Sequence, residues 1–210
     1  MKLRTLLAAT AVALASQSAM ATAELFFLVD GDTFTQPFRI TNQSTAGERV
    51  TRFQLNIAPS FMVFDTVAGG PPFNDSTARA FTPRAGSDVL TGLVPTLGPA
   101  DGASLLDISF TDFALDEIFV WDIDVDGDST DPDRATVTGN QLIGSLATID
   151  FSDGQRLFGT LSAVVGKPLA SQFIVTGRVI TPTLPEPGSL ALAGLALLAV
   201  GAARRSAKRA

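Results

Sequence analysis

The chain has 210 residues and contains neither cysteine nor histidine. The lack of these residue types excludes disulfides, thiol chemistry, a Ser-His-Asp triad and a histidine-ligated zinc site. Residues 24–187 carry nine basic and 21 acidic residues, a net charge of −12 that should repel nucleic acid and could attract divalent cations.

The N-terminus has the pattern of a secretory signal peptide: two basic residues, then an apolar stretch, then small residues. Two A-x-A cleavage sites overlap, one ending at Ala21 and the other at Ala23. We favour the second site, which makes residues 1–23 the signal peptide and Glu24 the first residue of the mature chain. Cleavage after Ala21 stays open as an alternative. Signal peptidase is therefore an expected processing partner.

Residues 24–183 form one predicted domain made of short β-strands. Apolar and polar residues alternate in segments such as 38–42 and 50–57, which is the period of a half-buried strand. Turn-forming residues separate most segments, and residues 152–155 (SDGQ) predict a hairpin. The fold class predicted is all-β, a single β-sandwich of the immunoglobulin-like or jelly-roll kind. The predicted strands are 24–29, 38–42, 50–57, 61–67, 105–110, 117–125, 134–138, 142–151, 156–165 and 172–181.

Residues 69–102 differ from the rest of the domain because they are rich in Gly, Pro, Ser and Asp. We expect a long connection, anchored to the core by Phe73 and Phe81 and containing one or two short strands. A loop of this length without structure of its own is uncommon in a compact domain.

An aspartate-rich stretch, DIDVDGDSTDPD, has the pattern of a calcium-binding loop, with acids at positions one, three, five and twelve and glycine at six. Calcium takes about six to eight oxygen ligands, and glycine permits the sharp turn that folds them around the ion. On this interpretation the cofactor is calcium, and otherwise no cofactor is expected. The predicted ligands are the side chains of Asp122, Asp124, Asp126 and Asp133 and the backbone carbonyl of Asp128.

The same stretch also fits the period of a β-strand. In that arrangement Trp121, Ile123 and Val125 point into the core, and the aspartates between them form an acidic edge that faces water. Trp121 is then a core residue and not a platform on which a sugar stacks. The sequence leaves both interpretations of the aspartates open.

The C-terminal segment, residues 184–210, has three parts. A stiff Pro-Glu-Pro tripeptide is followed by the uncharged, apolar residues 188–203, and four basic residues lie in the last seven positions. An apolar helix of that length spans roughly 24 Å, against a bilayer core of about 30 Å. The segment therefore predicts a single transmembrane helix, and the basic cluster predicts a cytoplasmic C-terminus.

These three parts, in this order and position, resemble the PEP-CTERM sorting signal of Gram-negative bacteria. The resemblance implies export, transient anchoring in the inner membrane and processing by an exosortase. A plain tail anchor would not need the prolines, and a buried helix would not need the basic cluster. The implied sorting-motif residues are Pro185, Glu186, Pro187, Gly188, Arg204 and Arg205.

The resemblance also implies an association with exopolysaccharide and biofilm matrix. The expected function is that of a non-enzymatic exported protein of the cell surface or the extracellular matrix. The alternative is a calcium-stabilised module that binds carbohydrate or serves in adhesion. Expected partners are thus the exosortase, signal peptidase and exopolysaccharide, and nucleic acid is not among them.

Overall fold

The computed structural model describes residues 22–70, 77–128 and 136–180. Asp133, most of the predicted signal peptide and the whole C-terminal segment 184–210 lie outside these residues. The elements in chain order are β1 Leu25–Asp30, β2 Phe38–Asn42, β3 Val50–Asn56, β4 Met62–Asp65, β5 Thr82–Pro83, α2 Ser87–Thr91, β6 Leu105–Phe113, β7 Ile118–Asp122, β8 Asp124–Gly127, β9 Leu146–Phe151, β10 Gln155–Val164 and β11 Lys167–Ile180, with short 3₁₀ helices at Ala58–Ser60 and Gly139–Leu142.

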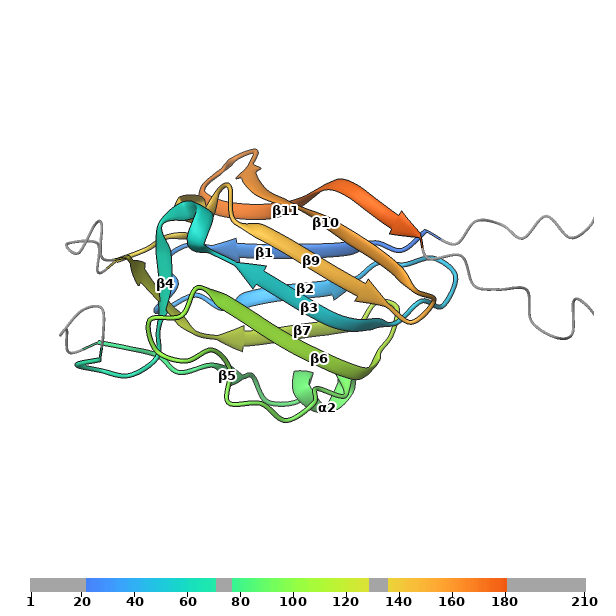
Figure 1. The fold of residues 1–210 in the computed structure, drawn as a ribbon, viewed down its shortest axis with the longest axis horizontal. Helices are drawn as coiled ribbons and strands as arrows, with labels where there is room; N and C mark the ends of the chain where they lie inside the picture. Colours follow the sequence, from blue (N-terminus) through green and yellow to red (C-terminus); the bar gives the residue numbers. More distant parts are fainter. Residues whose placement is uncertain (1–21, 71–76, 129–135, 181–210) are drawn as a thin grey trace, which may run out of the picture. The chain divides into compact units, whose positions relative to one another are not determined.

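Nine strands form one sheet in the order β5-β7-β2-β1-β11-β10-β9-β3-β6, and β4 and β8 form a second, two-stranded sheet. Figure 1 shows the large sheet curled into a half-barrel. The all-β prediction is confirmed. A sandwich of two separate sheets is not confirmed, because the 14-residue strand β11 lies between β1 and β10 and joins the two halves into one sheet.

The helix α2 bridges the two ends of the curled sheet. The Val120 amide of β7 donates to the Ser87 hydroxyl at 3.3 Å, and the Thr111 amide of β6 donates to the Gly92 carbonyl at 2.9 Å. The sequence did not predict this helix, because five residues are too few to show a helical period. Glycines with positive φ, 90° at residue 86 and 61° at residue 92, stand at its two ends.

The core lies inside the half-barrel and is rich in aromatic rings. Alternate residues of each strand point inward, so Phe27, Phe38, Phe53, Phe119 and Trp121 are all fully buried. Rings from opposite halves of the sheet meet there: Phe27 stacks on Phe53 at 6.0 Å, and Phe53 meets Trp121 edge-on at 5.9 Å. Trp121 is a core residue, as the strand interpretation predicted.

Most strands lie where the sequence predicted them, including the residues 38–42 of β2 and the hairpin between β9 and β10. The predicted strand 117–125 is divided at Ile123 into β7 and β8, which pair with different partners. Residues 69–102 contain β5 and α2 as the only strand and helix within their described part.

Candidate functional site

The aspartates of β7 and β8 lie on the strand face opposite to the aromatic core. Trp121, Ile123 and Val125 alternate with them and are fully buried in the core. The carboxylates are nevertheless shielded from solvent, because Asp122, Asp124 and Asp126 are only 5%, 3% and 0% exposed. An acidic edge facing water is therefore wrong for these three residues.

Two segments distant in the sequence lie beside β8. β4 pairs with β8, so that Asp65 lies directly opposite Asp124. The backbone at Arg79 continues this arrangement, since its amide donates to the Asp65 carbonyl at 3.2 Å and its carbonyl accepts from the Asp124 amide at 3.0 Å. Backbone from two distant parts of the chain therefore lies beside the buried aspartates of β8.

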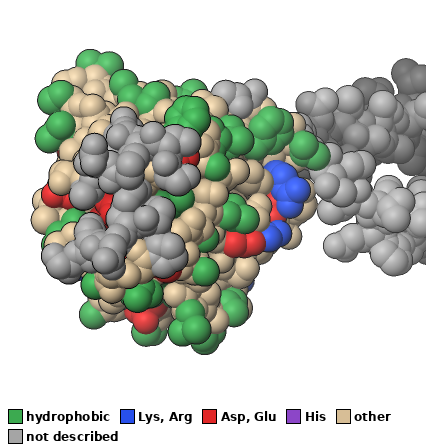
Figure 2. All heavy atoms as spheres, turned by 60° about the vertical axis from the view of Figure 1, so that its left-hand side comes forward, with side chains coloured by type: hydrophobic (Ala, Val, Ile, Leu, Met, Phe, Trp, Pro, Cys, Tyr) green, Lys and Arg blue, Asp and Glu red, His purple; other side chains and the backbone are tan. Residues whose placement is uncertain are grey.

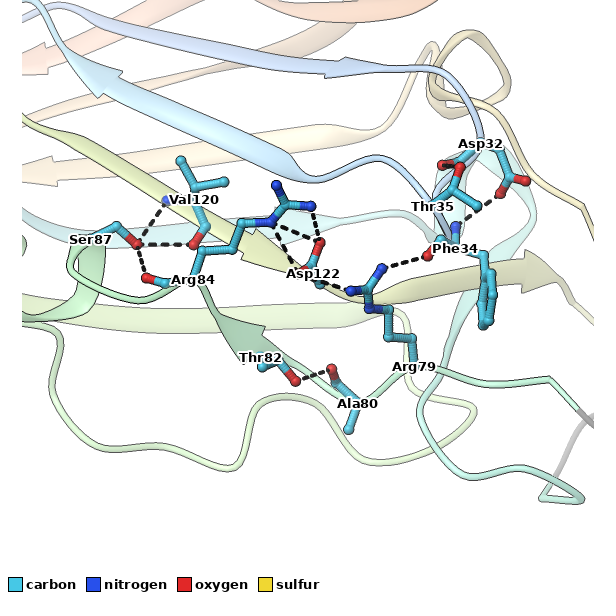
Figure 3. Close-up of polar contacts among 10 residues, drawn as sticks. All are labelled: Asp32, Phe34, Thr35, Arg79, Ala80, Thr82, Arg84, Ser87, Val120 and Asp122. Carbon is cyan, nitrogen blue, oxygen red and sulfur yellow. Dashed lines mark hydrogen bonds and ion pairs between the residues drawn. The ribbon is translucent and has the colours of Figure 1, made fainter.

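Asp122 is held by two arginines (Figure 3). Arg84 donates from Nε and Nη2 to both carboxylate oxygens at 2.9–3.3 Å. The Nη2 atom of Arg79 lies 3.1 Å from Oδ2 of Asp122, and its Nη1 donates to the Phe34 carbonyl at 2.7 Å. The hydrogen bonds with Asp122 raise the pKa of the Arg84 guanidinium above its ordinary value. Asp122 therefore fastens residues 79–84 to β7.

The Asp124 carboxylate accepts a hydrogen bond from the next residue of its own strand. Its Oδ1 accepts from the Val125 amide at 2.8 Å and lies 3.4 Å from the Thr33 hydroxyl. That hydroxyl has one proton, and the Val137 carbonyl at 3.1 Å is a closer acceptor for it. The Val125 amide therefore helps to orient the Asp124 carboxylate.

The structure brings only part of the predicted calcium loop together. Asp124 and Asp126 belong to β8, Asp122 faces the arginines, Asp128 is half-buried, and Asp133 lies outside the described residues. Among the residues that the structure describes, no three acidic side chains form a group that could hold a metal ion. Calcium binding stays a prediction.

Sequence reasoning missed four residues around these aspartates. Arg79 and Arg84 pair with Asp122. Asp65 lies opposite Asp124, and the Thr33 hydroxyl lies near the Asp124 carboxylate. Arg79 and Arg84 belong to the long connection whose position could not be deduced from its composition. Asp65 comes from a predicted strand, but nothing in its spacing indicated that it would pair with Asp124.

A second polar cluster crosses the outer surface of four strands. Arg156 of β10 pairs with Asp150 of β9, which lies opposite Arg52 of β3, and Arg52 pairs with Asp107 of β6. Gln54 also donates to Asp107 at 3.0 Å. The hydrogen bond from Arg52 lowers the pKa of Asp107, and the same bond raises the pKa of Arg52. Charges of opposite sign thus alternate from strand to strand.

Figure 2 shows acidic side chains at several places on one face of the domain and basic side chains in one region of it. Hydrophobic side chains are spread over this face in small groups, and basic side chains gather beside acidic ones. The overall acidity of the domain is therefore partly balanced locally, by pairs such as Arg52 with Asp107 and Lys167 with Asp30.

Comparison with known protein families identifies a PEP-CTERM protein-sorting motif at residues 183–206. The six predicted motif residues all fall inside this match. No curated protein and no solved structure matches the chain. The motif identifies an exported protein that is sorted and processed by an exosortase and is transiently anchored through its C-terminal segment.

The described part of the chain, up to residue 180, contains no helix that is long and apolar enough to cross a membrane. The transmembrane segment predicted at residues 188–203 lies outside that part.

Proposed function

We propose that the chain is a non-enzymatic protein of the cell surface or the extracellular matrix. A signal peptide directs it across the inner membrane, its C-terminal helix holds it there with the C-terminus in the cytoplasm, and an exosortase then releases it. The observation that carries this proposal is the sorting motif at residues 183–206. The association with exopolysaccharide and biofilm rests on the resemblance of the tail.

Two features of the domain support a role without catalysis. The chain has no histidine or cysteine, which removes the commonest general bases and nucleophiles. Asp122 is bound to Arg79 and Arg84 and fastens one segment of the domain to another. The two ion pairs of Asp122 give this carboxylate a structural role in the folded domain.

Mass spectrometry of the mature C-terminus, in the host and in a strain lacking the exosortase, tests the sorting. We expect the tail to be removed in the host and retained in the mutant strain. The matched control replaces Pro185 and Pro187 with alanine, which should give the retained tail in both strains. An identical C-terminus of the natural chain in both strains would contradict exosortase processing.

The matrix role is tested separately, by sedimenting the released protein with exopolysaccharide purified from the same host. We expect the protein to pellet with the polysaccharide and to stay in the supernatant without it. A protein that never pellets would contradict the association while leaving the sorting result unaffected.

A calcium-stabilised carbohydrate-binding or adhesion module is the second candidate. It is favoured by the placement of Asp65 directly opposite Asp124, both buried, beside a stretch with the spacing of a calcium loop. Calorimetry should then show heat on addition of millimolar calcium, and glycan binding on an array should disappear with a chelator. No heat and no change in melting temperature would dismiss this candidate.

A further inference from the structure

Thr22 and Ala23, which precede β1, are part of the folded domain. Ala23 continues the series of inward-pointing residues Leu25, Phe27 and Val29, all of which are buried. It is 1% exposed and belongs to the same hydrophobic cluster as those three residues. The Ala23 side chain thus packs in the core of the domain.

Backbone hydrogen bonds fix the same two residues. The Thr22 carbonyl accepts from the Thr45 amide at 3.2 Å. The Ala23 carbonyl accepts from Nη2 of Arg178 at 2.9 Å, and Nη1 of the same arginine donates to Gln155 at 3.3 Å. The start of the domain is therefore joined both to the connection between β2 and β3 and to the last strand, β11.

We infer that signal peptidase cleaves after Ala21 and that the mature chain begins at Thr22. The inference rests on the proposed signal peptide, within which the two overlapping A-x-A sites compete. Cleavage after Ala21 keeps the buried methyl group and both carbonyl acceptors. Cleavage after Ala23 removes them. It also turns the Glu24 nitrogen, which belonged to the same peptide group as the Ala23 carbonyl, into an α-ammonium group close to Arg178, so that two positive charges come close together.

A chain that begins at Glu24 should be less stable than a chain that begins at Thr22. The shorter chain lacks one buried side chain and two hydrogen bonds, one of which involves a charged donor. We expect its melting temperature to lie roughly 5 °C below that of the longer chain.

Mass spectrometry of the N-terminal peptide tests the inference on the full chain expressed in an exporting bacterial host. The expected main product begins at Thr22. A main product beginning at Glu24 would overturn the inference and leave the proposed export intact. A chain that still begins at Met1 would overturn both.

Two variants make the test independent of the folded state, because the changed residues are removed with the signal peptide. Ala19→Glu alters the small residue required at the start of the site that ends at Ala21, and leaves the site ending at Ala23 unchanged. Ser18→Glu adds the same charge outside both sites. We expect Ala19→Glu to reduce the yield of chains beginning at Thr22 severalfold and Ser18→Glu to have no effect. Unchanged processing of Ala19→Glu would contradict cleavage after Ala21.

Discussion

Arg84 and Asp122 are 38 residues apart in the sequence, yet Nε and Nη2 of the arginine both donate to the aspartate carboxylate at 2.9–3.3 Å. The Asp122 side chain is 7% exposed and that of Arg84 is 46% exposed. The pair therefore lies at the boundary between core and solvent, where a charge-assisted hydrogen bond contributes more than it does on an open surface.

Asp122→Asn is expected to lower the free energy of unfolding by about 2 kcal/mol. The asparagine keeps the volume but loses the charge, and its NH₂ group faces guanidinium groups that have no acceptor to offer. Urea unfolding of the purified mature protein measures the change. Asp107→Asn is the matched control, because Asp107 also pairs with an arginine but has a side chain that is 36% exposed. The control should cost less than about 1 kcal/mol, and equal costs for both variants would contradict the structural role of Asp122.

The Arg52–Asp107 pair predicts a dependence of stability on pH. The pKa of Asp107 is lowered in the folded state, chiefly by the hydrogen bond from Arg52. The pair therefore contributes to the free energy of unfolding at a pH above 3.8, the pKa of Asp107 in the unfolded chain. This contribution is lost as the pH falls through the lower pKa of the folded state. The difference in unfolding free energy between the natural protein and Asp107→Asn should be larger at pH 7 than at the lowest pH where both still fold. A difference that does not change with pH would show that the pair contributes no charge-dependent stability.

Trp121 is the single tryptophan of the chain and is fully buried among Phe38, Phe53 and Phe119. Its fluorescence in the folded protein should be blue-shifted and resistant to quenching by acrylamide, and soluble sugars should leave it unchanged. Unfolding in urea supplies the control, since the emission should then shift to the red and become quenchable. Quenching of the folded protein, or a response to sugar, would contradict a core position.

Trp121→Ala should lower the free energy of unfolding by about 3–5 kcal/mol, because it removes a large side chain from the centre of the core. Trp121→Phe is the milder variant, since it keeps an aromatic ring at the same place and should retain most of the stability. Thermal unfolding followed by circular dichroism compares the two. Equal melting temperatures for both variants would contradict the packing of the indole against its three aromatic neighbours.

Gly139 is expected to tolerate no side chain. A Cβ atom there would lie 2.4 Å from the Val29 carbonyl oxygen and 2.9 Å from that of Leu169, so the backbone would have to move. Gly144 is the matched control: it has open space around its Cβ position but a φ of 94°. Gly144→Ala should cost about 1–2 kcal/mol through backbone strain alone, and Gly139→Ala should cost more. The melting temperature of Gly139→Ala should therefore be lower than that of Gly144→Ala, and the reverse order would contradict the prediction.

The sequence by itself determined the position of most β-strands and the motif that sorts the protein. Alternation of apolar and polar residues is a local property, so β2 and the hairpin between β9 and β10 could be predicted from their own residues. The sorting motif is likewise a contiguous stretch that needs no folded context, and residues 183–206 match it. Its predicted residues could therefore be named without any tertiary structure.

Only the tertiary structure decided what happens to the aspartates and to the first residues of the domain. Asp122 and Asp124 alternate with core residues as predicted, but their neighbours in the fold include β4 and residues 79–84, which approach from distant parts of the chain. In the same way, the curled sheet results from the pairing of β11 with β1 and β10. Ala23 is buried and bound by Arg178 because β1 and β11 lie side by side. Interactions of this kind join residues far apart in the sequence, and no local pattern contains them.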